Sequence, residues 1–495
     1  MPHALSRRIA EVLTLRPEAD AIEFEQQWVS WRRLDRSARA IGALVGAHGA
    51  AGPAQVGILL RNRPVHVAAL LGVLSAGATV VVVNPSRGAD RLGTDLGALK
   101  LPVLIGDPED LAAIGIPDPG CRLIAVTDLH HQPRLTPASI DRACAAARPG
   151  VAVRMLTSGT TGPPKRIDLT YDMLAHSVIG ADAGNATAPA DVRRGVAIVN
   201  SPLVHIGGVF RVLSCVSEAR PFVLLERFDL DRWADAVRRH RPRAASLVPA
   251  ALRMVLHSDL RREDLESLRA VTSGTAPLSA DDAEAFTARF GVPVLTSYAA
   301  TEFGGGVAGW TLADHRRYWA AKRGSVGRAN PGARLRVVDE DRRPLAAGQT
   351  GLLEVVAPAL GPDATWMPTT DLARIDADGF LWIVGRADQA IIRGGFKVMP
   401  DDVRTALESH PAVAGAVVIG RPDDRLGEVP AAMVELRTPI SASTLSAHLA
   451  DRLARYEMPT DIRFVDAIPR TPSGKPDLSA VRTVFAATPT EPPAG

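Results

Sequence analysis

The chain has 495 residues, of which 46% are hydrophobic and 22% are charged, and this is enough for roughly two to four domains with their own cores. The formal net charge of +3 is too small to indicate a nucleic-acid or membrane-surface partner. Three cysteines without ligand spacing exclude a disulfide framework, and no long apolar segment follows the N-terminal charges as in a signal peptide. We therefore expect a cytoplasmic protein that is a monomer or a homodimer.

Short strands and helices alternate from about residue 18 onward, which predicts βαβ units and a parallel sheet. The uncharged stretch Val67–Val83 belongs to this pattern, because glycines interrupt it and its second half is β-branched, so we expect no membrane span there. Residues 107–150 are rich in Pro, Asp, His and Ala, and we interpret them as a loose connection. The first strands are expected at Ala21–Phe24, Gln55–Leu60, Thr79–Val83 and Val103–Gly106, with helices at Pro64–Ala76 and Asp90–Leu99.

An unusual polar loop follows the next predicted strand, which ends at Leu156. Its glycines leave backbone N–H groups unshielded, its hydroxyls add donors, and one lysine adds a positive charge, so polyphosphate is the ligand that suits it. It is not a Walker loop, because two prolines follow the second glycine. A plain polar surface loop is the alternative. The expected phosphate-binding residues are Thr157, Ser158, Gly159, Thr160, Thr161, Gly162 and Lys165.

The chain continues with a helix at Tyr171–Val178, which Thr170 is expected to cap, and a helix at Asp231–His240. Strands are expected at 196–199, 244–248, 271–273 and 293–297. From about residue 325 short strands and turns replace the alternation and predict an all-β subdomain. A helix near 401–409, two strands and a helix near 443–455 follow, and residues 481–495 are expected to fray.

Eight blocks in a fixed order resemble the adenylate-forming superfamily, which includes acyl-CoA and aryl-CoA synthetases, peptide-synthetase adenylation domains and beetle luciferases. The resemblance covers residues 20–480. The blocks are L-T-S-G-T-T-G-P-P-K (156–165), P-L-V-H-I-G-G (202–208), S-G-T-A-P-L-S (273–279), S-Y-A-A-T-E (297–302), G-S-V-G-R (324–328), T-T-D-L-A (369–373), D-G-F-L-W-I-V-G-R-A-D (378–388) and P-R-T-P-S-G-K (469–475).

The resemblance implies an α/β fold with a large N-terminal domain of βαβ subdomains and a small mobile α+β C-terminal domain. The large domain would span residues 1–387 and include a small β-barrel subdomain at about 325–387. The C-terminal lid domain would span 388–480. The resemblance also implies the reaction: a carboxylate attacks the α-phosphorus of ATP, pyrophosphate leaves, and the acyl-AMP passes its acyl group to a thiol, with CoA as the expected co-substrate.

Each block carries an implied role at the nucleotide. Glu302 would bind Mg2+ and Thr301 would contact the α-phosphate, and a hard carboxylate oxygen suits that metal. Asp371 would accept both ribose hydroxyls, and Arg386 would add a ribose or phosphate contact. Taken alone, Glu302 would be interpreted as a solvated loop acid. The adenine would be enclosed by Tyr298 together with the turn of Ser273, Gly274, Thr275 and Ala276.

The C-terminal domain would serve both half-reactions by rotating about a hinge at Asp388. One orientation would bring Lys475 to the carboxylate and the α-phosphate, although a lysine in such a turn is most often only exposed. The other would bring the loop of Gly394 and Gly395 and open a tunnel for a pantetheine thiol. His205 would gate the acyl pocket. The residues expected to line that pocket are His205, Val209, Thr272, Thr275, Ala299, Gly304, Gly305 and Gly306.

Several residues depart from the family pattern. Ala299 and Thr275 replace common glycines near the acyl pocket and would narrow it, which favours a small or flat acid over a long fatty chain. Thr370, Arg166 and Tyr171 also replace frequent family residues. The sequence leaves the acceptor open between CoA, a carrier protein and an amine, as in relatives that activate nitrite. A catalytically inactive nucleotide-binding regulator is the alternative from another class.

Overall fold

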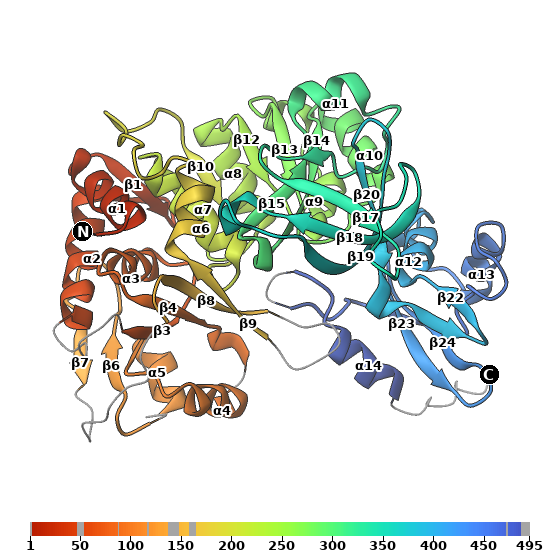
Figure 1. Cartoon of the computed structure of the whole chain (residues 1–495), viewed down its shortest axis with the longest axis horizontal. Coiled ribbons are helices and arrows are strands. Elements are labelled where there is room, and N and C mark those ends of the chain that lie inside the picture. The colour runs from red at the N-terminus through yellow and green to blue at the C-terminus, as the bar shows by residue number, and fades with distance from the viewer. Residues whose placement is uncertain are drawn as a thin grey trace.

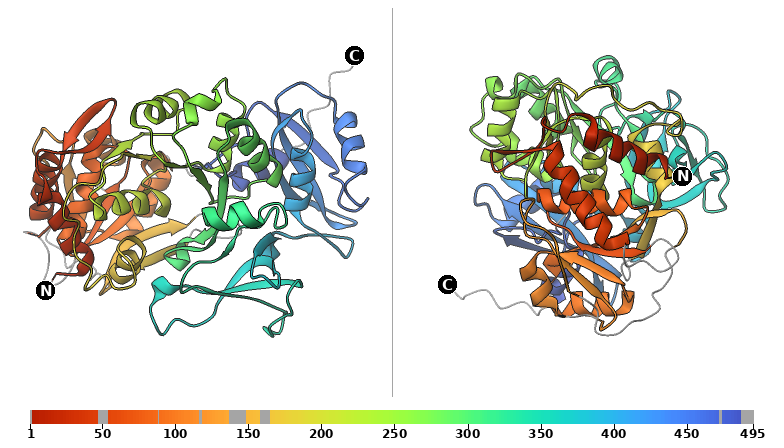
Figure 2. Two further views of the ribbon diagram at one scale, coloured as in Figure 1. Left: turned by 90° about the horizontal axis from the view of Figure 1, so that it is seen from above. Right: turned by 90° about the vertical axis from the view of Figure 1, so that its left-hand side faces the viewer.

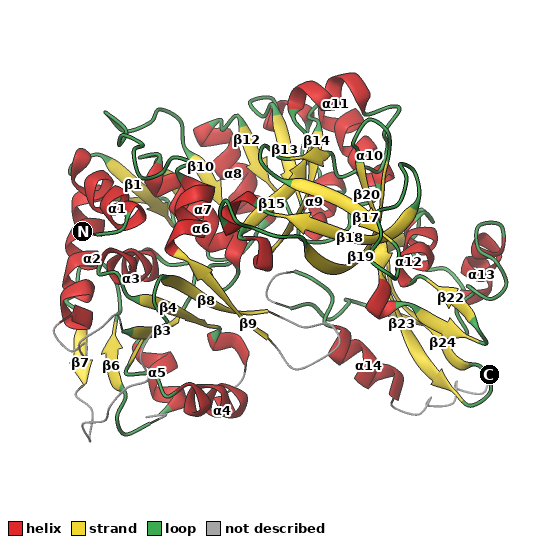
Figure 3. Ribbon diagram, in the orientation of Figure 1, coloured by secondary structure: helices red, strands yellow, loops and turns green. Residues whose placement is uncertain are grey.

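The computed structural model describes residues 2–46, 54–87, 89–115, 118–136, 148–157, 165–471 and 474–486. It is a mixed α/β chain with a large N-terminal domain and a small C-terminal domain, as expected (Figure 3). In the part of the chain that the structure describes, no helix is long and apolar enough to cross a membrane.

The first sheet has seven strands in the order β7-β6-β5-β3-β4-β8-β9, and its five inner strands are parallel. Alternate residues of β3 and β4 face two different cores: Ile58 and Val80 pack with α2 and α3, whereas Leu59 and Val81 pack with α4 and α5. The near-continuous apolar strands reflect this double burial. The elements are α1 (Ala4–Leu15), α2 (Trp31–Gly46), β3 (Gln55–Leu59), α3 (Pro64–Ser75), β4 (Thr79–Val83), α4 (Ala89–Leu99), β5 (Val103–Gly106), α5 (Pro108–Ile114), β6 (Arg122–Ala125), β7 (Arg134–Thr136), β8 (Val151–Thr157) and β9 (Lys165–Thr170).

Two further sheets complete the α/β part of the N-terminal domain. One has the order β10-β11-β1-β2, and the other has the order β12-β13-β14-β15-β16. Thr170 caps α6 as expected, because its hydroxyl accepts a bond from the Met173 N–H. The elements are β1 (Asp20–Phe24), β2 (Gln27–Ser30), α6 (Tyr171–Val178), β10 (Ala197–Val199), α7 (Ile206–Ser217), β11 (Phe222–Leu224), α8 (Leu230–His240), β12 (Ala244–Ser246), α9 (Pro249–Leu256), β13 (Ala270–Ser273), α10 (Ala280–Phe290), β14 (Val294–Ala300), β15 (Gly305–Gly309), α11 (Leu312–Tyr318) and β16 (Arg328–Ala329).

The expected β subdomain is an open four-stranded antiparallel sheet, with β17 and β20 at its edges rather than joined as in a closed barrel. Figure 2 (left) shows it beside the α/β part, with the C-terminal domain at one end of the molecule. Its strands are β17 (Arg334–Val338), β18 (Thr350–Val356), β19 (Met367–Ile375) and β20 (Leu381–Arg386).

The C-terminal domain is built on a sheet in the order β22-β21-β24-β23, with β25 also paired to β24. Its last helix reaches Ala486 and buries Val481 and Phe485, so the expectation that the chain frays from residue 481 is wrong for residues 481–486. The elements are β21 (Ile391–Arg393), β22 (Phe396–Val398), α12 (Pro400–Glu408), β23 (Val413–Asp423), β24 (Gly427–Leu436), α13 (Ala442–Ala450), β25 (Asp461–Val465) and α14 (Leu478–Ala486).

The loose connection expected at residues 107–150 is wrong in part, since α5, β6 and β7 lie there. Strand β6 has only four residues, which is too short for a clear sequence pattern, and β5 supplies its backbone partners on one side. Helix α7 was also not expected, because the two glycines at its start lower its helix propensity. The apolar side chains of α7 are buried in the same core as those of α1, α2 and α3, and this burial compensates for the low helix propensity of the glycines.

An ion-pair cluster joins the two domains. The Arg253 guanidinium on α9 donates to Asp282 on α10 at 2.7 Å and to Glu408 on α12 at 2.9 Å. Arg404 donates to the same Glu408 at 2.6 Å. The side chains of Arg253 and Glu408 are only 13% and 8% exposed, so water screens this cluster weakly. We call these four residues the interdomain cluster.

We expect Arg253→Met to lower the free energy of unfolding by roughly 1–3 kcal/mol, because it leaves two carboxylates of the interdomain cluster without their shared cation. The thermal midpoint should fall, and hydrogen exchange should accelerate in α9 and α12. Arg343→Met is the control, because Arg343 pairs with Asp341 and both side chains are mostly exposed. Equal effects of the two substitutions would contradict a special role for the cluster.

Thr275 has a strained backbone, with a φ of +70° in the turn after β13. This left-handed region disfavours a β-branched residue by about 1–2 kcal/mol. We expect Thr275→Gly to raise the free energy of unfolding by roughly 0.5–1 kcal/mol, because relief of strain exceeds the entropy that glycine adds to the unfolded chain. Denaturant titration measures it. Thr287→Gly, inside α10, should have the opposite sign, and a loss of stability in both variants would refute the strain.

Candidate active site

Lys475 lies where charged groups of both domains meet. The protein around its ammonium group lowers the pKa of Lys475, and the positive charge of Arg386 lowers it further, whereas the carboxylates of Glu302 and Asp371 oppose these shifts. The Lys475 side chain as a whole is nevertheless exposed to solvent. Figure 1 shows α14 and the segment before it turned toward the N-terminal domain. The structure therefore brings together four residues that are remote in sequence.

Asp371 and Arg386 are held opposite each other in the ladder of β19 and β20. The hydroxyl of Tyr298, on β14, donates a hydrogen bond to Asp371 from the neighbouring sheet. Burial raises the pKa of both Tyr298 and Asp371. Arg386 donates to Thr370 and Asp388 at 2.7 Å each. The Asp371 carboxylate therefore has a fixed position and can accept further hydroxyl donors.

The turn from Ser273 to Ala276 follows β13 and lies against β14. Gly274 allows this close packing, because an added Cβ would come within 2.9 Å of the Ser297 hydroxyl. The Ser273 hydroxyl is buried and has no hydrogen-bond partner among the residues that the structure describes. A buried polar atom without a partner is rare in folded proteins and is consistent with a ligand atom that it would bind.

Thr301 and Glu302 lie in the short helix η3 (Thr301–Phe303), directly after β14. The Glu302 side chain is exposed and forms no ion pair with any residue that the structure describes. The described residues contain no group of three His, Cys, Asp or Glu side chains that could hold a metal alone. Proteins usually hold Mg2+ with one or two carboxylates together with substrate phosphates. The Glu302 carboxylate could supply one such ligand.

His205 is the N-cap residue directly before α7, and its Nε2 atom is buried without a hydrogen-bond partner in the described part of the chain. Burial lowers the pKa of His205 to about 4, and the charge of Lys475 contributes to this. The imidazole is therefore neutral at pH 7, and it lies close enough to Lys475 to sense its charge. His205 belongs to the same site as Lys475, although 270 residues separate them in the chain.

Val209 on α7 is fully buried, in a core that also contains Val212 and Leu213. That it lines the acyl pocket stays a prediction. The half-buried face of α7 instead carries Arg211, whose Nη2 donates to the Thr272 hydroxyl at 3.2 Å. The signal that sequence reasoning missed is a single arginine within the apolar string I-G-G-V-F-R-V-L.

Four other residues expected at the acyl pocket lie on β14, on β15 or in the turn between them. Ala299 pairs with Gly306 across the two strands. Gly304 packs against Met173, and Gly305 lies beside Ser177. Residues 158–164 of the expected phosphate loop, Ser158, Gly159, Thr160, Thr161 and Gly162 among them, are outside the described residues. Their flanks are paired, since Thr157 lies opposite Lys165 in the ladder of β8 and β9.

The expected thiol-tunnel loop is turned away from Lys475 and its neighbours. Gly394 and Gly395 both have positive φ and form the turn between β21 and β22. Arg393 at the start of that turn donates to the carbonyls of Tyr456 and Met458, within the C-terminal domain. Asp388 lies in the short helix η5 (Ala387–Gln389) between the two domains. In this orientation, the C-terminal domain presents Lys475 rather than the glycine loop.

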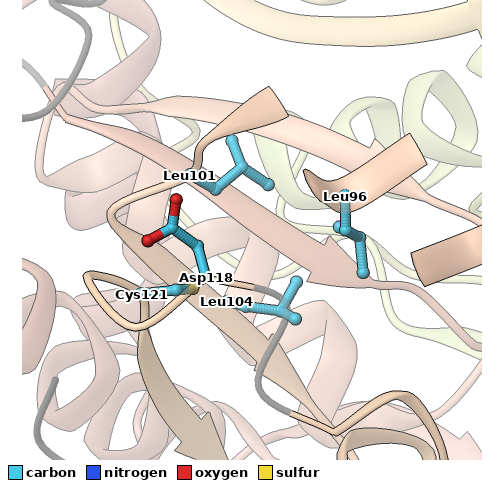
Figure 4. Close-up of a pocket in the computed structure, with 5 residues that line it drawn as sticks. All are labelled: Leu96, Leu101, Leu104, Asp118 and Cys121. Atoms are coloured by element: carbon cyan, nitrogen blue, oxygen red, sulfur yellow. The ribbon is translucent and has the colours of Figure 1, made fainter. Parts of the chain in front are cut away.

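A separate small pocket lies between α4, β5 and the turn before β6 (Figure 4). Its lining is mainly apolar, and none of the predicted site residues contributes to it. The five residues are Leu96, Leu101, Leu104, Asp118 and Cys121.

Comparison with known proteins matches both domains to AMP-binding enzymes. Residues 9–361 match the AMP-binding enzyme family, and residues 402–475 match the AMP-binding enzyme C-terminal domain. Indoleacetate–CoA ligase of Aromatoleum aromaticum is 29% identical, over 97% of this chain and 98% of its own. Sulfoacetate–CoA ligase of Cupriavidus necator is 30% identical, over 89% of this chain and 90% of its own.

Among solved structures, ATP-bound MatB from Rhodopseudomonas palustris is similar with a TM-score of 0.80 and 25% identity, covering 98% of this chain and 99% of that one. The expected superfamily is thereby confirmed, and with it an ATP-dependent ligase that activates an acid. The chain belongs to the AMP-binding enzyme family.

Proposed function

We propose that this enzyme joins a small or aromatic carboxylic acid to AMP, with ATP and Mg2+, and then passes the acyl group to CoA. The observation that carries the proposal is that the charges of Glu302, Asp371 and Arg386, all on the larger domain, act on Lys475 of the smaller domain. A cation supplied by the smaller domain at a cluster of nucleotide-binding groups suits a reaction in which negative charge gathers at a phosphate.

In the first half-reaction an acid carboxylate oxygen attacks the α-phosphorus of ATP, and pyrophosphate leaves. Lys475 binds the carboxylate and an α-phosphate oxygen together, so it orients both reactants and stabilises their charge. Asp371 accepts the ribose hydroxyls, and Thr301 contacts the α-phosphate. Glu302 would hold Mg2+, which neutralises phosphate charge when bound. The β- and γ-phosphates are proposed to bind to the loop of residues 157–165.

In the second half-reaction the thiolate of CoA attacks the acyl carbon, the acyl–oxygen bond breaks, and AMP leaves. In the present orientation Arg393, next to the glycine loop, donates to a backbone carbonyl of its own domain. We therefore infer that the C-terminal domain rotates about Asp388 after pyrophosphate leaves, so that Gly394 and Gly395 replace Lys475. Rotation requires the interdomain cluster to open, since Arg253 and Glu408 belong to different domains.

The acceptor could instead be a carrier protein or an amine, and the ATP-binding groups would be the same in each case. An inactive regulator is less well supported, because a nucleotide-binding regulator does not require Lys475 to meet Glu302 and Asp371. The named relatives act on an aromatic acid and on an acid with a sulfonate group. Both kinds of acid therefore belong in a test of this enzyme.

Lys475→Ala should reduce ATP–pyrophosphate exchange by about 10²–10³-fold, because it removes a preorganised positive charge from the transition state. Thioester formation from a presynthesised acyl-AMP should change much less, since another orientation of the C-terminal domain serves that step. Lys100→Ala is the control, because Lys100 is an exposed lysine next to β5. Exchange at a near-normal rate in the Lys475 variant would remove this residue from the mechanism.

Pyrophosphate release with a panel of acids tests the activity itself. The panel contains benzoate, indoleacetate, 4-coumarate, sulfoacetate and palmitate, each supplied with ATP and Mg2+. We expect release with compact or aromatic acids and none with palmitate, because Thr275 and Ala299 narrow the pocket. CoA, a carrier protein and an amine are then added in turn to identify the acceptor. ATP binding without release for any acid would favour the regulator.

A further inference from the structure

Helix α7 carries a guanidinium on the side that faces β13. The helix buries Gly208, Val209, Val212 and Leu213 in the core, so its opposite face points out of that core. Gly207 and Arg211 are four residues apart and share this outer face. A Cβ added to Gly207 would meet nothing within 4 Å, so the face has open space beside it.

Arg211 has a single hydrogen-bond partner in the part of the chain that the structure describes, the hydroxyl of Thr272. Thr272 precedes Ser273, whose buried hydroxyl has no hydrogen-bond partner among the described residues. A guanidinium has five N–H donors, so four of those on Arg211 are not used by described residues. These donors lie near the end of β13, where the acyl side of the proposed site is expected.

Other buried arginines in the described part of the chain have acceptors that satisfy the guanidinium. Arg154 pairs with Asp168 at 2.6 Å, Arg253 and Arg404 both pair with Glu408, and Arg8 donates to three backbone carbonyls. Arg211 has neither kind of acceptor among the described residues, and burial lowers its pKa. An arginine held only for packing or for one threonine bond would not require a charge, and burying an unpaired charge is costly.

We propose that Arg211 binds a second anionic group on the acid substrate, so that the preferred acids carry a carboxylate or a sulfonate in addition to the reacting carboxylate. This inference rests on the proposed function. The reacting carboxylate lies at His205 and Lys475, and the second group lies at Arg211 and Thr272. His205 and Arg211 are six residues apart, or about 9 Å along a helix axis. That spacing suits a compact diacid.

The test compares matched acids in the wild-type enzyme and in Arg211→Met. The pairs are benzene-1,3-dicarboxylate and benzene-1,4-dicarboxylate against benzoate, and succinate and sulfoacetate against butyrate. Pyrophosphate release is measured, with KM and kcat for each acid and for ATP. We expect the wild-type enzyme to favour a member of the anionic set, and the substitution to raise the KM of that acid roughly 10- to 100-fold. A comparison of the dicarboxylates with sulfoacetate identifies whether the enzyme prefers a carboxylate or a sulfonate as the second anionic group.

The KM values for benzoate, butyrate and ATP should stay unchanged in Arg211→Met, since these molecules do not use Arg211. Arg211→Lys should recover part of the preference for diacids. Ser214→Ala, on the same helix, is the control and should have no effect on the preference. A folded Arg211→Met that keeps the wild-type diacid-to-monoacid ratio would overturn the inference.

Three other outcomes also decide against it. A rise in the KM for ATP without a change for the acids would assign Arg211 to the nucleotide. A wild-type enzyme that releases pyrophosphate with monoacids but with no diacid would refute the inference and leave the proposed function intact. No release with any acid would instead refute the proposed function and this inference together. If Arg211→Met does not fold, Arg211→Gln provides the same comparison, because it removes the charge but keeps a polar side chain that can bond to Thr272.

Discussion

The approach of one lysine to two carboxylates across a domain boundary is the constraint on which the site depends. Lys475 belongs to the smaller domain, and Glu302 and Asp371 belong to the larger one. The interdomain cluster of Arg253, Glu408 and their partners holds the domains in the orientation that permits this approach. Charges that are weakly screened contribute more than surface pairs, so a few contacts can favour one orientation without making it permanent.

The N-terminal part of the site is built where strands end. Strand β14 continues directly into the short helix that carries Glu302, and β13 continues into the turn of Ser273. Tyr298 then joins this sheet to Asp371 on the β17–β20 sheet through one hydrogen bond. Because the backbone at strand ends is fixed by the ladder, side chains there keep their positions before a ligand arrives, which reduces the entropy lost on binding.

The acyl side of the site differs from the nucleotide side in its electrostatics. His205 is buried and neutral at pH 7, whereas Arg211 on the same helix keeps a charge that no described carboxylate balances. A neutral group near the reacting carboxylate does not compete with Lys475 for it. A cation farther along the helix would recognise a second charge. His205 would therefore lie near the reacting carboxylate, and Arg211 would determine specificity.

Local patterns in the sequence determined most elements, because periodicity, capping and glycine placement act between neighbours: β4 and the cap at Thr170 match their expected residues. The order of the eight motifs determined the family. Only the tertiary structure decided which face of α7 is buried, so that Val209 lies in the core and Arg211 faces β13. It alone decided that Lys475 comes within electrostatic range of Glu302, since the proximity of residues far apart in the chain depends on how whole domains pack.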